Sequence, residues 1–386
     1  MAGVIFDGKL VAPAIVVEKP VFTDEWQPNP NWWDIKKILD EDTRDYAGKV
    51  GVILYNFNDV SDFQLSSSGM TAVATSDGAF YTYADNGGNV SHNWDTSKDK
   101  DDGRGFKTRW VIYYYTTDTT RDTFGQSNAK FGWGYNYIAY LVLRINCSNG
   151  SSFCSTQRLL EAIDNTGYVI SGTNFSNFCY VCGSLTKLPD GLDTSNGTNF
   201  TQFCAGCYSL TRLPDGLDTS NGTSFSSFCS TCYSLTKLPD GLDTSNGTNF
   251  NYFCYYCYSL TKLPDGLDTS NGTNFDYFCS YCYSLQEVPA FSTSANTTAI
   301  TSKYIAPFHT TTWLKTAFIT LPSNTNFWLD ISTRISIESF RYIADHAPDV
   351  TATPRTLTLG STNITRINEA DPTIITDLNA KGWTVA

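Results

Sequence analysis

The chain has 386 residues, and its 26 Lys and Arg against 38 Asp and Glu give a formal net charge of −12. Non-specific nucleic-acid binding needs clustered positive charge, so this balance excludes nucleic acid as an expected partner. No run of about 18 apolar residues occurs, so we expect no membrane insertion. Asp7 and Lys9 stand where a secretory signal would need an apolar core, so we expect no such signal.

The first 148 residues differ in composition from the rest of the chain. Residues 1–30 hold four prolines and indicate an extended N-terminal arm, which we expect to lie against a partner or a symmetry mate. Residues 31–148 are rich in tryptophan and in short β-prone runs separated by turn residues, and one helix is expected near 33–42. We therefore predict a β-rich, sandwich-like attachment domain at 31–148, with strands near 50–55, 79–83, 110–115 and 137–145.

A unit of 25 residues recurs almost verbatim from 175 to 289, as in FSSFCSTCYSLTKLPDGLDTSNGTN at 225–249. A fixed period of this length indicates stacked supersecondary units, which we call rungs. Residues 150–174 match the same pattern as a diverged first rung. We therefore place a repeat solenoid at 149–291 and irregular C-terminal repeats with a cap at 292–386.

The pattern within one rung predicts a helix, a strand and two turns. Phe175, Phe178, Cys179 and Cys182 recur at i, i+3, i+4 and i+7, the spacing of one face of a short helix. Two leucines follow as a short inward-facing strand, and the Pro-Asp-Gly and Asp-Thr-Ser-Asn-Gly segments suit turns. Towards the C-terminus, helices are expected at 337–346 and 368–380 and strands at 355–359 and 383–385.

The unit F-C-x-x-C-x-S-L-T-x-L-P-x-x-L-D-T-S-N resembles the BspA-type leucine-rich repeats, which are 25-residue units. Cys182 and its equivalents fall on the family cysteine, whereas Cys179 and Gly197 stand where the family usually has Phe and Val. The resemblance implies an α/β leucine-rich-repeat-like solenoid with a short helix plus a strand per rung, preceded by the mainly-β N-terminal domain. Family members are mostly surface proteins, adhesins and phage virion proteins, so the resemblance implies display of a surface.

Cys-x-x-Cys pairs are the sharpest chemical feature of the rungs, because this is also a spacing of zinc ligands. The pairs lie among phenylalanines on the face expected to be buried, and their interval follows the repeat period. Free cysteine is a good small core residue, so we predict a ladder of buried thiols, with disulfides and a metal site as alternatives. We expect no metal and no cofactor. The predicted ladder consists of Cys179, Cys182, Cys204, Cys207, Cys229, Cys232, Cys254, Cys257, Cys279 and Cys282.

Two columns of aspartates recur at the turns, one beginning at Asp190 and one at Asp193. Stacked like charges repel one another, and a column of Ca²⁺ could relieve that repulsion. The other interpretation is turn and cap chemistry in solvent, helped by Lys187 and its equivalents nearby. We expect turns.

The rungs differ mainly at a few positions expected to face away from the core. These positions carry Tyr, Ser, Asn, Gly, Thr and Asp, which antibody-like binding surfaces favour. Two interpretations stay open: a receptor- or glycan-binding face, or free drift of exposed positions after duplication. The candidate ligand-binding residues are Tyr252, Tyr255, Tyr256, Tyr258, Tyr277, Tyr281 and Tyr283.

We recognise no catalytic constellation, because His92, His309 and His346 are isolated in sequence and no nucleophile motif or phosphate loop occurs. We therefore expect no enzyme and no catalytic residues. The leading hypothesis is a phage virion structural or fibre protein, made in the host cytoplasm and exposed on the particle surface or tail. Its N-terminal region would attach to other virion proteins, and its rungs would bind a host surface protein or glycan. A bacterial cell-surface BspA-like adhesin is the alternative, and a homo-oligomer is compatible with both.

Overall fold

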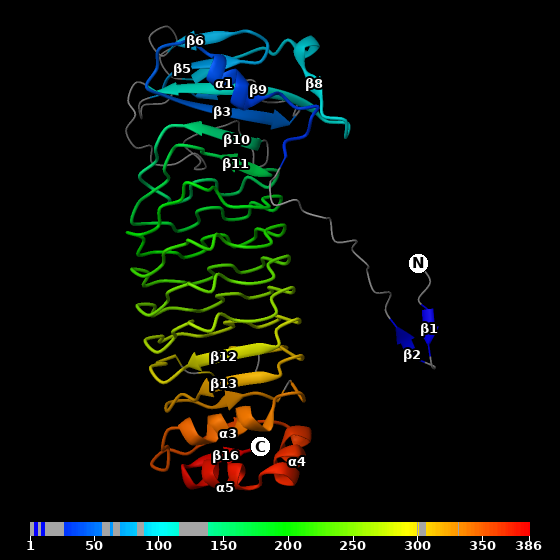
Figure 1. Cartoon of the computed structure of the whole chain (residues 1–386), viewed down its shortest axis with the longest axis vertical. Helices are drawn as coiled ribbons and strands as arrows, with labels where there is room; N and C mark the ends of the chain where they lie inside the picture. The colour runs from blue at the N-terminus through cyan, green and yellow to red at the C-terminus, as the bar shows by residue number, and fades with distance from the viewer. Residues whose placement is uncertain are drawn as a thin grey trace.

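The computed structural model describes residues 4–6, 9–11, 27–55, 62–64, 70–82, 89–115, 138–298, 300, 306–330 and 332–386. From residue 27 onwards the described residues form a tall column, with a β-sheet at one end, a stack of coils in the middle and helices at the other end (Figure 1). Near the N-terminus, β1 (Val4–Phe6) and β2 (Lys9–Val11) pair antiparallel. Most of the predicted arm at 1–30 lies outside the described residues.

A seven-stranded sheet forms the N-terminal end of the column. Its central strand β3 is buried on both faces because its sequence VGVILY is apolar without alternation. Helix α1 (Ile35–Glu41) begins after Asp34, whose carboxylate accepts the Lys37 N–H, and covers one face of the sheet. Gly51 allows this close approach, since a Cβ there would lie 2.7 Å from Ile35. Across the sheet the strands are β11 (Ala162–Asp164), β10 (Ile138–Arg144), β3 (Gly48–Tyr55), β9 (Lys107–Tyr115), β5 (Met70–Thr75) and β6 (Phe80–Thr82), with β8 (Lys100–Asp101) beside β9.

This region differs from the expected sandwich-like domain in how it joins the rungs. Strand β11 belongs to the first, diverged rung, and it pairs in parallel with β10, with Tyr140 opposite Ala162. Side chains of the sheet such as Val52 and Leu141 belong to the same buried cluster as the rungs. The apolar core therefore runs across the expected boundary at 148/149, and the sheet closes the end of the stack. A further small pair, β4 (Asp62–Gln64) and β7 (Asn89–Ser91), is antiparallel.

The rungs stack through a parallel ladder of backbone hydrogen bonds. The N–H groups of Asn177, Cys179 and Val181 donate to carbonyls of the next rung at 2.8, 2.9 and 2.7 Å. The amides between them donate within the rung instead, as Phe178 does to the Phe175 carbonyl at 3.3 Å. Alternate amides thus bind the neighbouring rung and the remaining amides close tight turns.

The short helix that the sequence predicts in each rung does not form. Residues 150–286, all of them described, contain turns, isolated β-bridges and the short strand β11 but no α-helix. The third and seventh residues of the 25-residue unit have a left-handed backbone, with φ of 56° at Asn177 and 59° at Val181. An α-helix would satisfy its amides internally, whereas here the neighbouring rung takes every second one. The leucine segment is likewise mostly irregular, with single bridges such as Arg212 to Lys237.

Two columns of stacked phenylalanines fill the centre of the rungs. One column begins at Phe175 and repeats at 5.6–5.7 Å between ring centroids, and the other, including Phe178, repeats at 5.0–5.4 Å. All of these rings are fully buried. Gly197 stands where the repeat family usually has Val because a Cβ there would lie 2.5 Å from the Phe200 ring and 2.9 Å from the Thr194 carbonyl oxygen.

The return turns are held by side chains as well as by the backbone. Asp193 accepts the N–H and the hydroxyl of Ser195 at 3.1 and 2.7 Å, and the Asn221 amide donates to the Ser195 carbonyl of the preceding rung at 2.8 Å. In the other aspartate column, Asp190 pairs with Lys187 at 2.6 Å. Asp193 thus accepts hydrogen bonds within its turn, and Asp190 forms a local ion pair.

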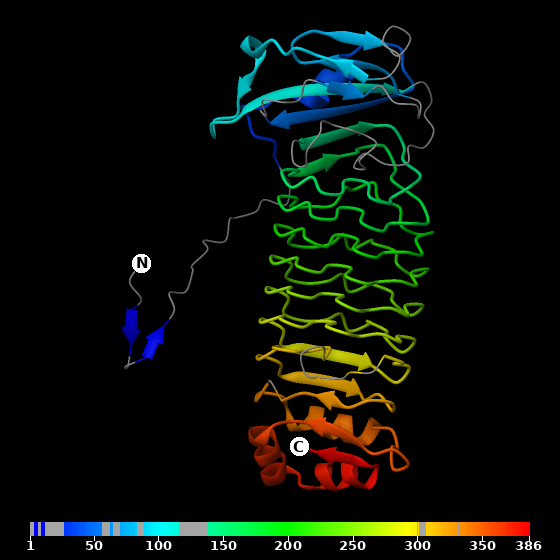
Figure 2. The same ribbon diagram turned by 180° about the vertical axis from the view of Figure 1, so that it is seen from behind.

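The C-terminal part continues the stack and then closes it. Trp383 near the chain end belongs to the same buried cluster as the rungs. The helix expected at 368–380 is interrupted: α4 ends at Ala370, and Pro372, which cannot continue a helix, precedes α5. Viewed from behind, the red C-terminal helices cover the end opposite the sheet (Figure 2). The elements are β12 (Glu287–Ser292), β13 (Thr316–Thr320), β14 (Phe327–Trp328), α3 (Ile337–His346), β15 (Arg355–Thr358), α4 (Ser361–Ala370), α5 (Thr373–Ala380) and β16 (Trp383–Val385).

Candidate recognition surface

A column of tyrosines lies along the side of the rungs, one directly after the second cysteine of each unit from residue 200 onwards; the unit 175–199 has Gly183 there. Its members are Tyr208, Tyr233, Tyr258 and Tyr283. Their rings stack at 4.9, 4.8 and 5.3 Å, with interplanar angles of 20° or less. Such stacking turns ring faces towards one another, so the ring edges and hydroxyls are what the column offers to solvent.

A second group of tyrosines adjoins this column in the rungs 250–274 and 275–299. Tyr252 stacks on Tyr277 at 4.7 Å, and Tyr256 lies 4.5 Å from Tyr281. Tyr255 stands between the two pairs, edge-on to Tyr252 at 5.1 Å and 4.1 Å from Tyr256. We call this group together with the column the tyrosine surface: Tyr208, Tyr233, Tyr252, Tyr255, Tyr256, Tyr258, Tyr277, Tyr281 and Tyr283.

The structure brings all seven candidate ligand-binding tyrosines into this one surface. The two groups are joined where Tyr256 contacts Tyr258 at 5.7 Å and where Tyr281 contacts Tyr283 at 6.3 Å. The sequence did not predict one aromatic neighbour of this surface. His309 was expected to be isolated, but its ring centroid lies 5.5 Å from that of Tyr281. The repeat interval lengthens after residue 289, so no 25-residue spacing points to His309.

Four of these tyrosines have a left-handed backbone. Tyr252, Tyr256, Tyr277 and Tyr281 have φ of 56°, 60°, 57° and 64°. Such a conformation costs a bulky residue about 1–3 kcal/mol, and glycine or asparagine adopts it more easily. Earlier rungs place glycine at one equivalent position, Gly206. The rung geometry imposes this conformation, so tyrosine is used here in spite of the backbone cost.

Tyr255, between the two pairs, keeps its phenol proton at neutral pH. Burial, and then the neighbouring phenols of Tyr256 and Tyr281, raise the pKa of Tyr255 above its ordinary value. Burial also raises the pKa of the adjacent Asp276, whose Oδ1 has no hydrogen-bond partner among the described residues. Phenol rings and hydroxyls are therefore the groups available for binding.

The cysteine ladder lies entirely inside the rungs. All twelve cysteines of the chain are buried, and none of them forms a disulfide. In one column the thiols donate to backbone carbonyls of the preceding rung at 2.8–3.1 Å, as Cys232 does to Cys204. In the other column Cys204 and Cys229 have sulfurs 3.3 Å apart, beyond the roughly 2.05 Å of a disulfide. Burial raises the pKa of most of these thiols, including Cys254 and Cys279.

One cysteine group could hold a metal by proximity alone. The sulfurs of Cys204, Cys229 and Cys232 all lie within 4.8 Å of one another. Structural zinc takes four ligands, and within the described part of the chain no fourth His, Cys, Asp or Glu joins these three. The Cys232 thiol is also engaged with a carbonyl. The group therefore fits a thiol ladder better than a zinc centre.

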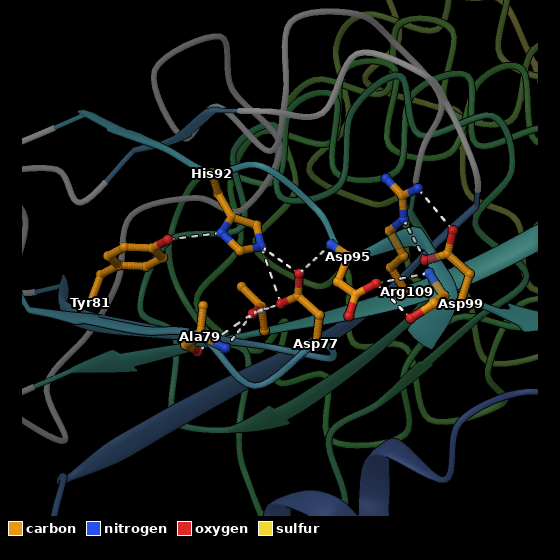
Figure 3. Close-up of polar contacts among 9 residues, drawn as sticks. Asp77, Ala79, Tyr81, His92, Asp95, Asp99 and Arg109 are labelled. Carbon is orange, nitrogen blue, oxygen red and sulfur yellow. Dashed lines mark hydrogen bonds and ion pairs between the residues drawn. The ribbon is translucent and has the colours of Figure 1, made fainter.

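A second polar cluster lies in the N-terminal sheet (Figure 3). His92, expected to be isolated, contacts Asp77 at 2.9 Å through Nε2 and the Tyr81 hydroxyl at 2.8 Å through Nδ1. Asp77 also accepts the Asp95 N–H at 2.9 Å, next to the short helix η1 (Thr96–Lys98). Catalytic triads join Asp, His and a nucleophile in this way, but here His92 and Asp77 are each 5% exposed and a phenol takes the third place. We interpret the cluster as structural, because its hydrogen bonds hold these segments together.

The tyrosine surface can bind a ligand through rings and hydroxyls, and no nucleophile–base pair lies within it. No helix of the described residues is both long enough and apolar enough to cross a membrane. No protein-family model matches the chain, and neither a curated protein nor a solved structure was found to be similar to it.

Proposed function

We propose that the chain is a non-enzymatic phage virion fibre or appendage protein that binds a host surface through the tyrosine surface. Its N-terminal region attaches to other virion proteins, and the column of rungs is exposed. The single observation that carries the binding proposal is the continuous set of nine tyrosines, four of them held in a left-handed backbone. Tyrosine at adjoining variable positions of two neighbouring rungs, next to the stacked column, fits a binding role better than free drift.

The ligand is a host surface protein or glycan, and the ring stacking favours a protein. Sugars bind best over an open aromatic face, whereas the column from Tyr208 to Tyr283 covers its own faces. Ring edges and hydroxyls instead suit peptide groups and aliphatic side chains, as in antibody paratopes. Many copies on one particle would add modest contacts into firm adhesion.

The binding proposal is tested by exchanging one rung's surface for that of its neighbour. The triple variant Tyr252→Ser, Tyr255→Ser and Tyr256→Thr gives the rung 250–274 the residues that Ser227, Ser230 and Thr231 already provide in the rung before. These residues fit the same backbone, so we expect the variant to fold. Binding of labelled protein to the bacterium on which the particle propagates, measured by flow cytometry, should fall at least about tenfold.

A control variant in the same rung separates loss of the tyrosines from general damage. Lys262→Ala disturbs an exposed ion pair with Asp265 at 2.8 Å, away from the tyrosine surface. It should bind like the parent protein. Unchanged binding by the triple variant would contradict the proposal for the tyrosine surface. The virion context is tested separately by mass spectrometry of purified particles, where the chain should be present in a fixed copy number. A bacterial cell-surface BspA-like adhesin remains the alternative, and finding the chain only on cells would favour it.

A further inference from the structure

A pocket of about 430 Å³ lies where the N-terminal sheet meets the rungs, on residues that the tyrosine surface does not include. Helix α1, strands β10 and β11 and the turn after Lys187 all contribute to its walls. A second pocket of about 240 Å³ shares Lys187, Leu188 and Asp190 with the first and extends to Arg212 and Pro214 in the next rung. The two pockets are therefore neighbours in one elongated groove that runs along the stack.

Four of the charged groups that line this groove form two ion pairs with one another. Lys36 lies 3.7 Å from Asp164, and Lys187 lies 2.6 Å from Asp190. Asp34 accepts the Lys37 N–H at the start of α1. An ionic ligand would have to displace the paired lysines or carboxylates from one another. A neutral ligand could instead donate hydrogen bonds to the carboxylates while these stay paired with their lysines. The charge pattern thus favours a neutral, polar ligand.

The remaining lining combines aromatic and apolar surface with these oxygens. Trp33 is anchored by its ring N–H, which donates to the Thr108 carbonyl at 3.1 Å, and Tyr140 donates its hydroxyl to Asp164 at 3.4 Å. Both are pocket residues, with Leu188 beside them. Small-ligand pockets measure about 300–1,000 Å³ and combine apolar walls with a few placed polar groups, as this one does.

We propose that this groove binds a neutral oligosaccharide. Sugar rings carry apolar faces that pack on aromatic and aliphatic walls, and their hydroxyls donate to carboxylates such as Asp164 and Asp190. The elongated shape over two adjoining pockets suits a short chain of sugar units in place of one compact molecule. This inference rests on neither the virion proposal nor the tyrosine surface.

The test screens the full chain against an array of neutral oligosaccharides, with sialylated and sulfated ones alongside. We expect at least one neutral oligosaccharide to bind, and titration calorimetry then gives its Kd for the parent and for Asp190→Ala. Asp190 has a side chain 75% exposed, so its removal should leave the fold intact. Loss of one charge-assisted hydrogen bond should weaken binding about tenfold or more.

The repeats supply a matched control. Asp265 makes the same ion pair with Lys262 at 2.8 Å, its side chain is 76% exposed, and it lines neither pocket. Asp265→Ala should bind the same sugar within about twofold of the parent. Absence of any neutral binder, binding of anionic sugars only, or equal weakening by the Asp190 and Asp265 variants would overturn the proposal. The triple tyrosine variant should retain sugar binding, so the two proposals can fail independently.

Discussion

Gly247→Ala tests whether the close packing of the phenylalanine columns dictates glycine in the Asn-Gly-Thr turn. A Cβ at Gly247 would lie 2.3 Å from Cζ of Phe250, 2.9 Å from the Thr244 carbonyl oxygen and 3.0 Å from the Phe225 ring. Real Cβ contacts are about 3.4 Å or longer, so the neighbours must move by about an ångström. Phe250 cannot yield freely, because it is fully buried between rings at 5.6 Å on either side.

The expected effect is a clear loss of stability. Overpacking a well-packed core costs about 1–3 kcal/mol. Alanine also restricts the unfolded chain, which offsets about 0.4–1 kcal/mol of that cost. The free energy of unfolding should therefore fall by about 1–2 kcal/mol, read from urea denaturation followed by circular dichroism. Because stacked rungs can unfold in steps, hydrogen exchange of the rung 225–249 should report the same loss locally.

Another glycine of the same rung is the control. A Cβ at Gly241 would meet no heavy atom within 4 Å, so Gly241→Ala should be neutral or slightly stabilising. Adding Phe250→Leu to Gly247→Ala should cost less than the sum of the two single changes, because the smaller ring-free side chain makes room for the Cβ. Equal stability of the Gly247 and Gly241 variants would refute the packing argument.

Three other predictions concern buried polar groups. The twelve buried thiols should resist a thiol reagent in the native protein and all react in denaturant, whereas stoichiometric zinc or a non-reducible subset would contradict a ladder of free thiols. Asp276→Asn should raise stability at pH 7, because burial raises the folded-state pKa of Asp276; the gain should vanish below about pH 4, and a constant gain would disagree. Burial raises the pKa of Asp77, but hydrogen bonds from Thr75, Asp95 and His92 lower it by more. The contribution of Asp77 to the free energy of unfolding is therefore present above the unfolded pKa of about 3.9, and it is lost as pH falls through the lower folded pKa. His92→Ala removes one hydrogen bond to this carboxylate and should cost about 1.5–3 kcal/mol at pH 7. It should also flatten the acid limb in urea titrations, and an unaltered limb would contradict the structural role of the cluster.

The repeat period predicts much of the rung interior. Residues 25 apart become neighbours in a stack, so the recurring Phe175 and Cys182 positions can be assigned to the core from sequence, and they are fully buried. The same reasoning brings Tyr252 next to Tyr277 and Tyr256 next to Tyr281, which is how the tyrosine surface could be anticipated.

The local conformation within a rung could not be predicted in the same way. Spacing of i, i+3, i+4 and i+7 suits a helix, but a series of tight turns also brings Phe175, Phe178 and Cys182 to one side. Hydrogen bonds to the next rung decide between the two, and their partners lie 24 residues away, as the bond from the Asn177 N–H to the Thr201 carbonyl shows. The closure of the N-terminal sheet onto the first rung depends equally on distant pairing, between Tyr140 and Ala162.

The pockets and the contacts of His92 could not be predicted from the sequence either. His92 meets Asp77 and Tyr81 through a fold in which no fixed spacing links them. The groove beside Lys187 needs α1 to lie against the first rungs, which no repeat pattern encodes.

The most direct test of the account is surface binding by the triple variant Tyr252→Ser, Tyr255→Ser and Tyr256→Thr, compared with the parent and with Lys262→Ala. All three proteins should give the same circular dichroism spectrum, and their free energies of unfolding in urea should agree within about 1 kcal/mol, because the preceding rung carries the exchanged residues on the same backbone. The account predicts that only the triple variant loses binding to the host bacterium, by about tenfold or more. Parent-like binding by a folded triple variant would contradict it.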